Sequence, residues 1–151
     1  MRFVLALLLL VTSVSCSPSE TRKSPTELSE SSAQNSKLIS VVIVRDGETS
    51  SKLPQSILNQ FTSIKIRDYC FTHCILSPES NPEFRIFDEN TDVSKESKSI
   101  RDLFKQATDG LTKDSKRRPW IAIGSGASIF NTSLPATEAE TLNLLKKYGG
   151  E

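Results

Sequence analysis

The spacing of apolar residues along the chain predicts four strands. Residues 38–44 form a nearly continuous β-branched run, which is typical of a strand that is covered on both faces. Residues 84–87 alternate between apolar and polar positions and predict a second strand. Residues 120–123 form a short apolar strand, and residues 127–131 can pair back on it after the glycine turn at 124–126.

Helical spacing fills the interval between the first two strands. Apolar residues within 53–61 recur at three- and four-residue intervals and predict one helix. Residues 64–76 place apolar and soft side chains on one face of a second helix, which Pro78 and Pro82 close. A strand over residues 64–67 remains an alternative for the start of this segment.

Two further helices are predicted in the second half of the chain. Apolar residues within 100–107 follow the i, i+3, i+4, i+7 pattern of a surface helix, and Gly110 is expected to end it in a left-handed conformation. Thr137 and Glu140 form a capping box, which predicts the start of a last amphipathic helix. Gly149 is expected to be the C-cap of this helix.

The order of these elements over residues 38–150 resembles that of the thioredoxin fold. Residues 84–88 look like the second strand of that family. Arg118–Pro119–Trp120 stands where the family places a cis-proline just before its third core strand, and Leu134–Pro135 looks like the start of its closing segment. The resemblance implies an α/β fold, a thioredoxin-like three-layer sandwich in which helices cover both faces of a mixed β-sheet.

The N-terminus has the layout of a secretory signal. Arg2 precedes nine apolar residues, 3–11, which as a helix span only about 14 Å of a bilayer core of about 30 Å. Cys16 follows Ser13–Ser15 and resembles the lipidated cysteine of the bacterial lipobox, although Ser13 stands where that motif usually has leucine. We expect lipidation of Cys16, and ordinary cleavage nearby is the alternative.

Composition divides the chain into three parts. Residues 1–16 are the predicted signal peptide, and residues 17–36 form a tether rich in serine, proline and charge that buries too little apolar surface to fold. Residues 37–151 form the predicted thioredoxin-like domain. We therefore expect an exported lipoprotein, anchored in a membrane through a lipid on Cys16 and facing the periplasm or the cell exterior, with a protein of the cell envelope as its partner.

Charge excludes one class of partner. The sequence has 19 Lys and Arg residues against 18 Asp and Glu residues, and Arg2 lies in the predicted signal peptide. A nearly neutral domain argues against nucleic acid as the main partner. The basic cluster at 116–118 is interpreted as a solvated loop.

Cys70, Cys74 and His73 are the candidate reactive residues. Thioredoxin-like enzymes carry Cys-x-x-Cys after the first strand, but residues 45–51 contain no cysteine. On a helix the two cysteines share a face, about 6 Å apart along the axis. Three interpretations stay open: two buried packing residues, a disulfide or redox pair, and a soft-metal site for Cu(I) or Zn(II) with His73.

The metal interpretation gains a further resemblance, to copper-delivery proteins of the thioredoxin fold. Those proteins use Cys-x-x-x-Cys and a histidine, but there the cysteine pair follows the first strand and the histidine is distant in the sequence. We predict no resident cofactor. The primary hypothesis is a non-catalytic binding or accessory role, and the alternative is a redox or metal-handling role for Cys70, Cys74 and His73.

In the family that the chain resembles, the proline faces the reactive cysteines across a groove. Here the expected opposite wall is residues 47–50, which carry no thiol. Pro119 and Trp120 are therefore predicted to border a groove that binds a partner and carries out no reaction. This hypothesis requires that neither Cys70 nor Cys74 lies beside Pro119.

Overall fold

The computed structural model describes residues 38–151, so the predicted signal peptide at 1–16, with Cys16, and the tether at 17–36 lie outside the described residues. The described part contains four strands, four α-helices and one short 3-10 helix. In chain order these are β1 (Ile39–Arg45), η1 (Ser50–Lys52), α1 (Gln55–Phe61), α2 (Ile64–His73), β2 (Phe84–Asp88), α3 (Lys98–Lys113), β3 (Trp120–Ser125), β4 (Ser128–Ser133) and α4 (Glu138–Gly149).

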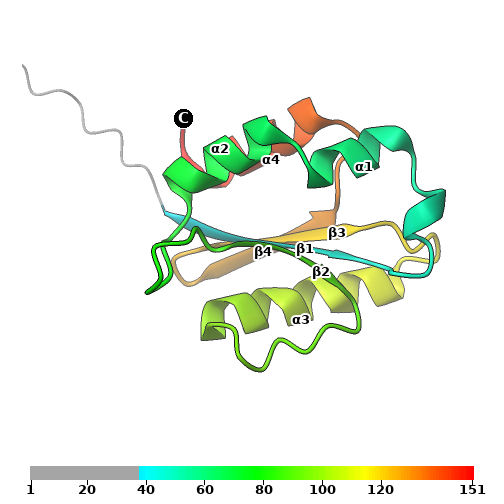
Figure 1. The fold of residues 1–151 in the computed structure, drawn as a ribbon, viewed down its shortest axis with the longest axis horizontal. Helices are drawn as coiled ribbons and strands as arrows, with labels where there is room; N and C mark the ends of the chain where they lie inside the picture. Colours follow the sequence, from blue (N-terminus) through cyan, green and yellow to red (C-terminus); the bar gives the residue numbers. More distant parts are fainter. Residues whose placement is uncertain (1–37) are drawn as a thin grey trace, which may run out of the picture. The chain divides into compact units, whose positions relative to one another are not determined.

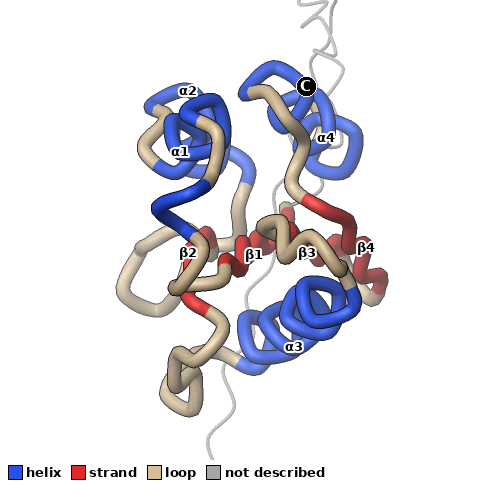
Figure 2. Tube along the Cα trace, turned by 90° about the vertical axis from the view of Figure 1, so that its right-hand side faces the viewer, coloured by secondary structure: helices blue, strands red, loops and turns tan. Residues whose placement is uncertain are grey.

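The strands form one mixed sheet in the order β2-β1-β3-β4. β1 runs parallel to β2 and antiparallel to β3, and β3 runs antiparallel to β4. Helices α1, α2 and α4 lie on one face of this sheet, and α3 lies on the other (Figure 1, Figure 2). The predicted α/β class is confirmed, with a mixed sheet of four strands. The alternative strand over residues 64–67 is wrong, because these residues open α2.

β1 supplies side chains to two apolar cores because successive residues of a strand point to opposite faces. Ile39, Val41 and Ile43 belong to the core beneath α1, α2 and α4. Val42 and Val44 belong to the core beneath α3. All five side chains are essentially inaccessible to water, which confirms the prediction of a strand covered on both faces.

The helix starts follow the capping signals in the sequence. The Ser97 hydroxyl accepts a hydrogen bond from the backbone N–H of Ile100 and begins α3. Thr137 and Glu140 form the predicted capping box at the start of α4, with both reciprocal hydrogen bonds present. These side chains satisfy backbone N–H groups that a helix leaves without partners in its first turn.

The two glycines that were predicted to end helices lie inside them. α3 continues past Gly110 to Lys113, and α4 includes Gly149 and is capped by Gly150 at φ 89°. Gly110 faces the Trp120 ring so closely that a Cβ atom there would overlap a ring carbon. A Cβ atom at Gly149 would lie 2.7 Å from the Tyr69 hydroxyl oxygen. Both glycines therefore serve close packing and not helix termination.

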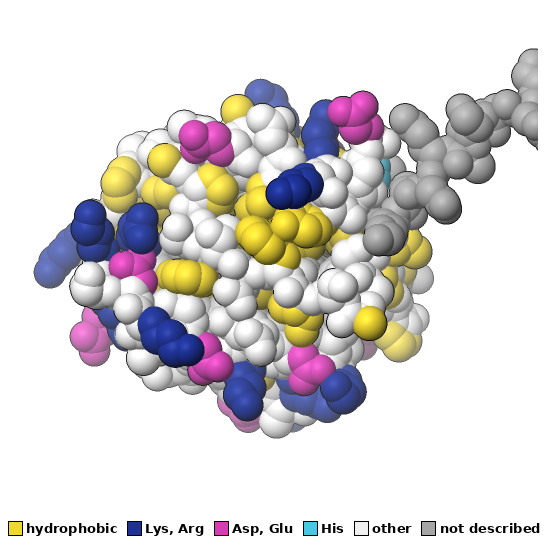
Figure 3. Space-filling model, turned by 180° about the vertical axis from the view of Figure 1, so that it is seen from behind, with side chains coloured by type: hydrophobic (Ala, Val, Ile, Leu, Met, Phe, Trp, Pro, Cys, Tyr) yellow, Lys and Arg dark blue, Asp and Glu magenta, His cyan; other side chains and the backbone are white. Residues whose placement is uncertain are grey.

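Figure 3 shows the molecule from the side of β4 and α4, where hydrophobic side chains gather. Between these two elements the rings of Phe130 and Tyr148 stack with their centroids 4.8 Å apart. The Lys147 ammonium lies 5.6 Å from the centroid of the Tyr148 ring. The stacking of Phe130 on Tyr148 packs α4 against the edge strand β4.

Across the described residues, no helix combines the length and the apolar character needed to cross a membrane.

Replacing Gly110 with alanine is expected to destabilise the domain, although alanine favours helices by about 1 kcal/mol. The added methyl group must displace the Trp120 ring, and overpacking of this kind costs about 1–3 kcal/mol. Urea unfolding should therefore show a net loss of up to about 2 kcal/mol.

Asp109→Ala, at the exposed neighbouring position of α3, is the matched control and should stay within about 0.5 kcal/mol of wild type. In a protein that carries Trp120→Val, Gly110→Ala should cost less than it does in wild type, because the smaller side chain makes room for the methyl group. A Gly110→Ala protein as stable as wild type would contradict the close packing.

Candidate functional site

A groove with a volume of about 470 Å³ opens where the start of α1 faces the segments before β3 and after β4. We call it the proline groove, because each of these three segments contributes a proline. Its lining residues are Leu53, Pro54, Ile57, Arg118, Pro119, Ser133, Leu134, Pro135, Ala136 and Glu140. Its volume lies within the range of about 300–1,000 Å³ that is usual for small-molecule and side-chain sites.

Hydrogen bonds between distant segments hold the walls of the proline groove. The backbone N–H of Leu134 donates to the carbonyl oxygen of Pro119 at 2.7 Å and joins two of the walls. The Gln60 side-chain amide donates to the carbonyl oxygen of Pro135 at 3.0 Å. Thr141 on α4 in turn donates to the Gln60 amide oxygen at 2.7 Å, and both of these polar side chains are buried. Behind the apolar lining of the groove, the buried side chains of Gln60 and Thr141 are thus hydrogen-bonded to each other and to the wall.

The chemistry of the proline groove favours contact over reaction. Proline has no backbone N–H, so Pro54, Pro119 and Pro135 offer apolar rings and no donors from their own backbone nitrogens. The two charged lining residues are already engaged: Arg118 pairs with Asp114 at 2.8 Å, and the Glu140 carboxylate accepts the capping-box hydrogen bond. No lining residue is a cysteine or a histidine.

An ionic cluster of Asp46, Arg117 and Glu89 joins three loops at the same end of the sheet. Arg117 Nε donates to Asp46 Oδ2 at 3.1 Å, and Arg117 Nη2 donates to Glu89 Oε2 at 2.6 Å. Asp46 follows β1, Glu89 follows β2, and Arg117 lies two residues before Pro119. Arg117 adopts φ 50°, a left-handed conformation that is uncommon for a residue with a Cβ atom. The cluster therefore fixes the loop that carries Pro119 against the loop that leads to α1.

The Asp46 carboxylate is buried and strongly hydrogen-bonded. Burial raises the pKa of Asp46. The hydrogen bond from Arg117 and those from the backbone N–H groups of Glu48 and Thr49 outweigh burial, so the pKa lies below the usual value. The ionised form is therefore favoured in the folded protein.

The structure separates the two residues that were expected to share a groove. Pro119 lies in the proline groove, but Trp120 packs against α3 on the other face of the sheet, where its ring covers Gly110. The opposite wall is formed by Leu53, Pro54 and Ile57 and not by residues 47–50. The described residues contain no cis peptide bond, so the Arg118–Pro119 bond, whose isomer the sequence leaves open, is trans and differs from the cis-proline of the family that the chain resembles.

Cys70 and Cys74 lie at the other end of β1. Both are buried free cysteines, and Cys74 forms a bridge with Ile39, the first residue of that strand. Pro119 directly precedes Trp120, which pairs with Val44. Ile39 and Val44 are five residue steps apart along the strand, or about 17 Å. Neither cysteine is therefore beside Pro119, as the hypothesis of a non-reactive groove requires.

His73 does not join the two cysteines in a metal site. Its Nδ1 donates to the carbonyl oxygen of Tyr69 at 3.0 Å, and its ring stacks on the Tyr69 ring with centroids 4.1 Å apart. Within residues 38–151, no group of three or more His, Cys, Asp or Glu side chains is arranged to hold a metal ion. The three predicted residues thus form a buried thiol pair and a separate, partly exposed imidazole.

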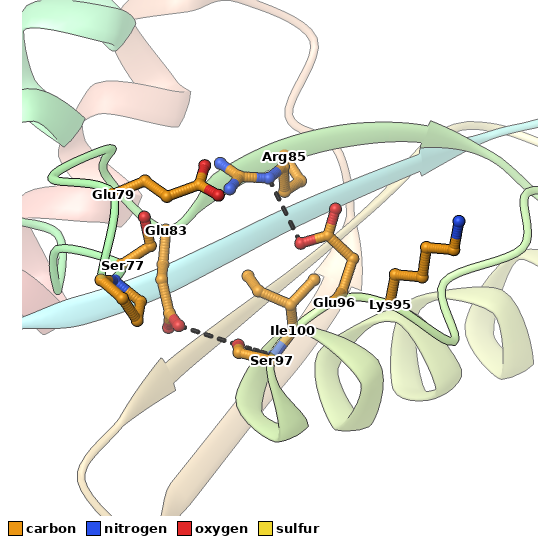
Figure 4. A pocket seen from close by; sticks show the side chains of 9 residues that line it. Ser77, Glu79, Glu83, Arg85, Lys95, Glu96, Ser97 and Ile100 are labelled. Carbon is orange, nitrogen blue, oxygen red and sulfur yellow. Dashed lines mark hydrogen bonds and ion pairs between the residues drawn. The ribbon is translucent and has the colours of Figure 1, made fainter.

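A second hollow, between the loop that precedes β2 and the start of α3, is polar (Figure 4). Glu83 is buried there without an ion pair, and its two carboxylate oxygens accept hydrogen bonds from the hydroxyls of Ser40 and Ser97. Arg85 pairs with Glu96 at 3.5 Å on the opposite side. Because Ser97 also caps α3, this cluster attaches the start of that helix to the sheet.

Sequence reasoning missed most walls of the proline groove and all of the ionic cluster. Residues 53–61 show helical spacing, which does not reveal that Leu53 and Pro54 face Pro119. Residues 116–118 look like a solvated basic loop, yet Arg117 bonds carboxylates from two other loops. The one available signal was a pair of prolines, Pro119 and Pro135, flanking the last two strands.

Comparison of the chain with models of protein families, with curated proteins and with solved structures gives no match.

Replacing Asp46 with asparagine should lower stability and flatten its dependence on pH. The pKa of Asp46 is lower in the folded protein than in the unfolded chain, where it is about 4. The ionised carboxylate therefore contributes fully to the free energy of unfolding above about pH 4, and this contribution is lost as the pH falls through the pKa of the folded protein. At pH 7 the substitution should cost about 1–2 kcal/mol, and the difference from wild type should shrink below pH 4.

Urea unfolding from pH 7 to pH 3 measures this difference. Asp68→Asn, an exposed position on α2, is the control and should follow wild type across the range. A difference between Asp46→Asn and wild type that stays constant down to pH 3 would contradict the role of the ionised carboxylate.

Proposed function

We propose that this chain is an exported, lipid-anchored thioredoxin-like domain that binds a protein of the cell envelope and does not catalyse thiol–disulfide exchange. The proline groove is the binding site, and its ligand is an apolar side chain on an exposed segment of the partner. The mixed sheet with helices on both faces supports the thioredoxin-like assignment, because this is the arrangement that the sequence resemblance implies.

One observation carries the binding role: the groove is apolar, and hydrogen bonds fix its walls. A preformed site loses little conformational entropy when a ligand enters, so a modest contact area can give useful affinity. The bonds from Leu134 to Pro119 and from Gln60 to Pro135 order two of the walls before any partner arrives. Ala136 lies exposed at the rim, so the groove opens to solvent.

The absence of a thiol from this groove supports binding over exchange. An exchange reaction needs a thiolate that a partner disulfide can reach. The lining of the proline groove has no cysteine. Cys74 bridges Ile39, about 17 Å along β1 from the residue that pairs with Trp120, and Cys70 is buried in the core one helical turn before Cys74. The proposed function therefore places no covalent step at Pro119.

The proposed location rests on the sequence before residue 38. The positive residue, apolar run and Cys16 together indicate export and a lipid on the new N-terminus. The tether at 17–36 is long enough to hold the domain away from a membrane surface. A partner at the same membrane would then meet the groove at a high effective concentration.

Filling the proline groove should abolish binding without unfolding the domain. Ala136→Arg places a large side chain at the exposed rim, where it blocks entry of an apolar ligand. Peptides selected on the full chain from a displayed random library serve as the probe, with affinity measured by fluorescence anisotropy. We expect Ala136→Arg to weaken the selected peptides by tenfold or more.

Ala139→Arg supplies the matched control, because Ala139 is exposed on α4 and does not line the groove. It should leave the affinity within about twofold of wild type. Peptides that bind Ala136→Arg as tightly as wild type, or a selection that yields no binder, would rule out the groove as the binding site.

The lipid anchor can be tested separately from the groove. Cys16→Ser removes the only thiol that precedes the tether, so the variant should move from the detergent phase to the aqueous phase in fractionation of bacterial cells that express the full chain. The Cys74→Ser variant should remain in the detergent phase. Retention of Cys16→Ser with the membrane would show that the chain is held there by something other than this cysteine.

A further inference from the structure

Cys70, in the last turn of α2, and Cys74, the C-cap of that helix, belong to the same apolar core beneath α1, α2 and α4. Cys70 is fully buried, and Cys74 is 2% exposed. The backbone N–H of Cys74 donates to the carbonyl oxygen of Cys70 at 2.8 Å, which is the last hydrogen bond of the helix. The hydrogen bond between the two thiols and burial together raise the pKa of the Cys70 thiol well above its usual value.

The backbone geometry suits a covalent bond between these sulfurs. Four residues along a helix separate Cα atoms by about 6 Å, within the range of about 4.4–6.8 Å found for disulfides. Neighbouring Cβ atoms of a regular helical turn diverge, but Cys74 is the C-cap of α2 and has φ −87° and ψ 152°. Its backbone has therefore left the helix, so no following helical turn constrains it, and its bridge with Ile39 joins it to the sheet.

We propose that Cys70 and Cys74 form an intramolecular disulfide when the folding chain meets a small external disulfide such as oxidised glutathione. The thiolate of Cys74 attacks one sulfur of the external disulfide, forms a mixed disulfide and releases one thiolate. The thiolate of Cys70 then attacks the Cys74 sulfur, closes the ring and releases the second thiolate. Two protein thiols are oxidised, one external disulfide is reduced to two thiols, and the two protons pass to the released thiolates.

Cys74 is assigned the first step because it is at the end of the helix. Helix ends open more readily than helix centres, and a single backbone hydrogen bond joins Cys74 to α2. Cys70 is surrounded by the core, where its hydrogen bond with Cys74 and burial raise the pKa of its thiol, so it is the poorer first nucleophile of the two. Burial in the native state predicts slow reaction after folding, so the ring should close mainly during folding.

The ring would fasten the end of α2 where the following residues join the sheet. Ile75 donates its backbone N–H to the carbonyl oxygen of Ile39 at 2.8 Å, one residue after Cys74. A ring this small lowers the equilibrium constant for unfolding by at most about thirtyfold on the chain-entropy model. This effect is independent of the proline groove, and peptide binding there should not depend on it.

The experiment refolds the full chain carrying Cys16→Ser, so that Cys70 and Cys74 are its only thiols. One sample refolds in reduced glutathione and another in a mixture of oxidised and reduced glutathione. Maleimide labelling after denaturation should find two thiols in the first sample and none in the second. The oxidised protein should be lighter by about 2 Da, and peptide mapping should join Cys70 to Cys74.

Two results would overturn the proposal. One is two reactive thiols in the oxidised sample, and the other is a stable glutathione adduct or a linked dimer in place of the ring.

Two control variants cannot form the ring, because each keeps only one of the two thiols. They are Cys74→Ser and, in case serine is not tolerated, Cys74→Ala. Reductant should lower the urea midpoint of the oxidised parent and leave both variants unchanged, and an equal shift in the variants would show that the ring does not stabilise the protein.

Discussion

The burial of β1 on both faces is the constraint on which the rest of the structure depends. β1 pairs with β2 and β3, and its alternate side chains fill the two cores beneath the opposing helix layers. Such a strand has no surface left for polar chemistry, because a polar group there needs a buried partner. Ser40 is such a case: its hydroxyl is buried, and it donates a hydrogen bond to the Glu83 carboxylate. A site that uses this strand must therefore lie at one of its ends.

The two ends of β1 have different chemistry, and the loops explain the difference. Beyond Arg45 three loops meet, and the Asp46–Arg117–Glu89 cluster fixes them together, which leaves the prolines of the groove in defined places. At Ile39 the chain returns from α2 directly into a bridge with the sheet, so Cys74 and its neighbour Cys70 are drawn into the core. One end thus presents a rigid apolar surface to solvent, and the other encloses a thiol pair. Binding and thiol chemistry are separated by the length of a strand.

Patterns governed by local geometry were predictable from the sequence, and contacts between distant segments were not. The strands, the capping box at Thr137 and the buried face of α2 all follow from spacing over a few residues. Gly110 and Gly149 misled the prediction because a glycine required for close packing looks the same in the sequence as one that ends a helix. Trp120 was placed in the groove because its neighbour Pro119 is there, yet adjacent residues of a strand point to opposite faces. The ionic cluster joins positions 28 and 71 residues apart, which no local pattern reveals.

The separation of groove and thiols supports the binding role that we propose over the redox or metal-handling alternative. If the cysteines were the functional centre, the structure should expose them or place a ligand site beside them, and it buries both within the core under α2 and α4. Their burial fits a pair that stabilises the fold after oxidation, whereas a reagent for other proteins needs an accessible thiolate. The groove has the opposite properties, since it is open to solvent, ordered by hydrogen bonds and free of nucleophilic thiols. A binding role at Pro119 and a stabilising role for Cys70 and Cys74 are therefore compatible, because each uses an end of β1 that the other leaves unchanged.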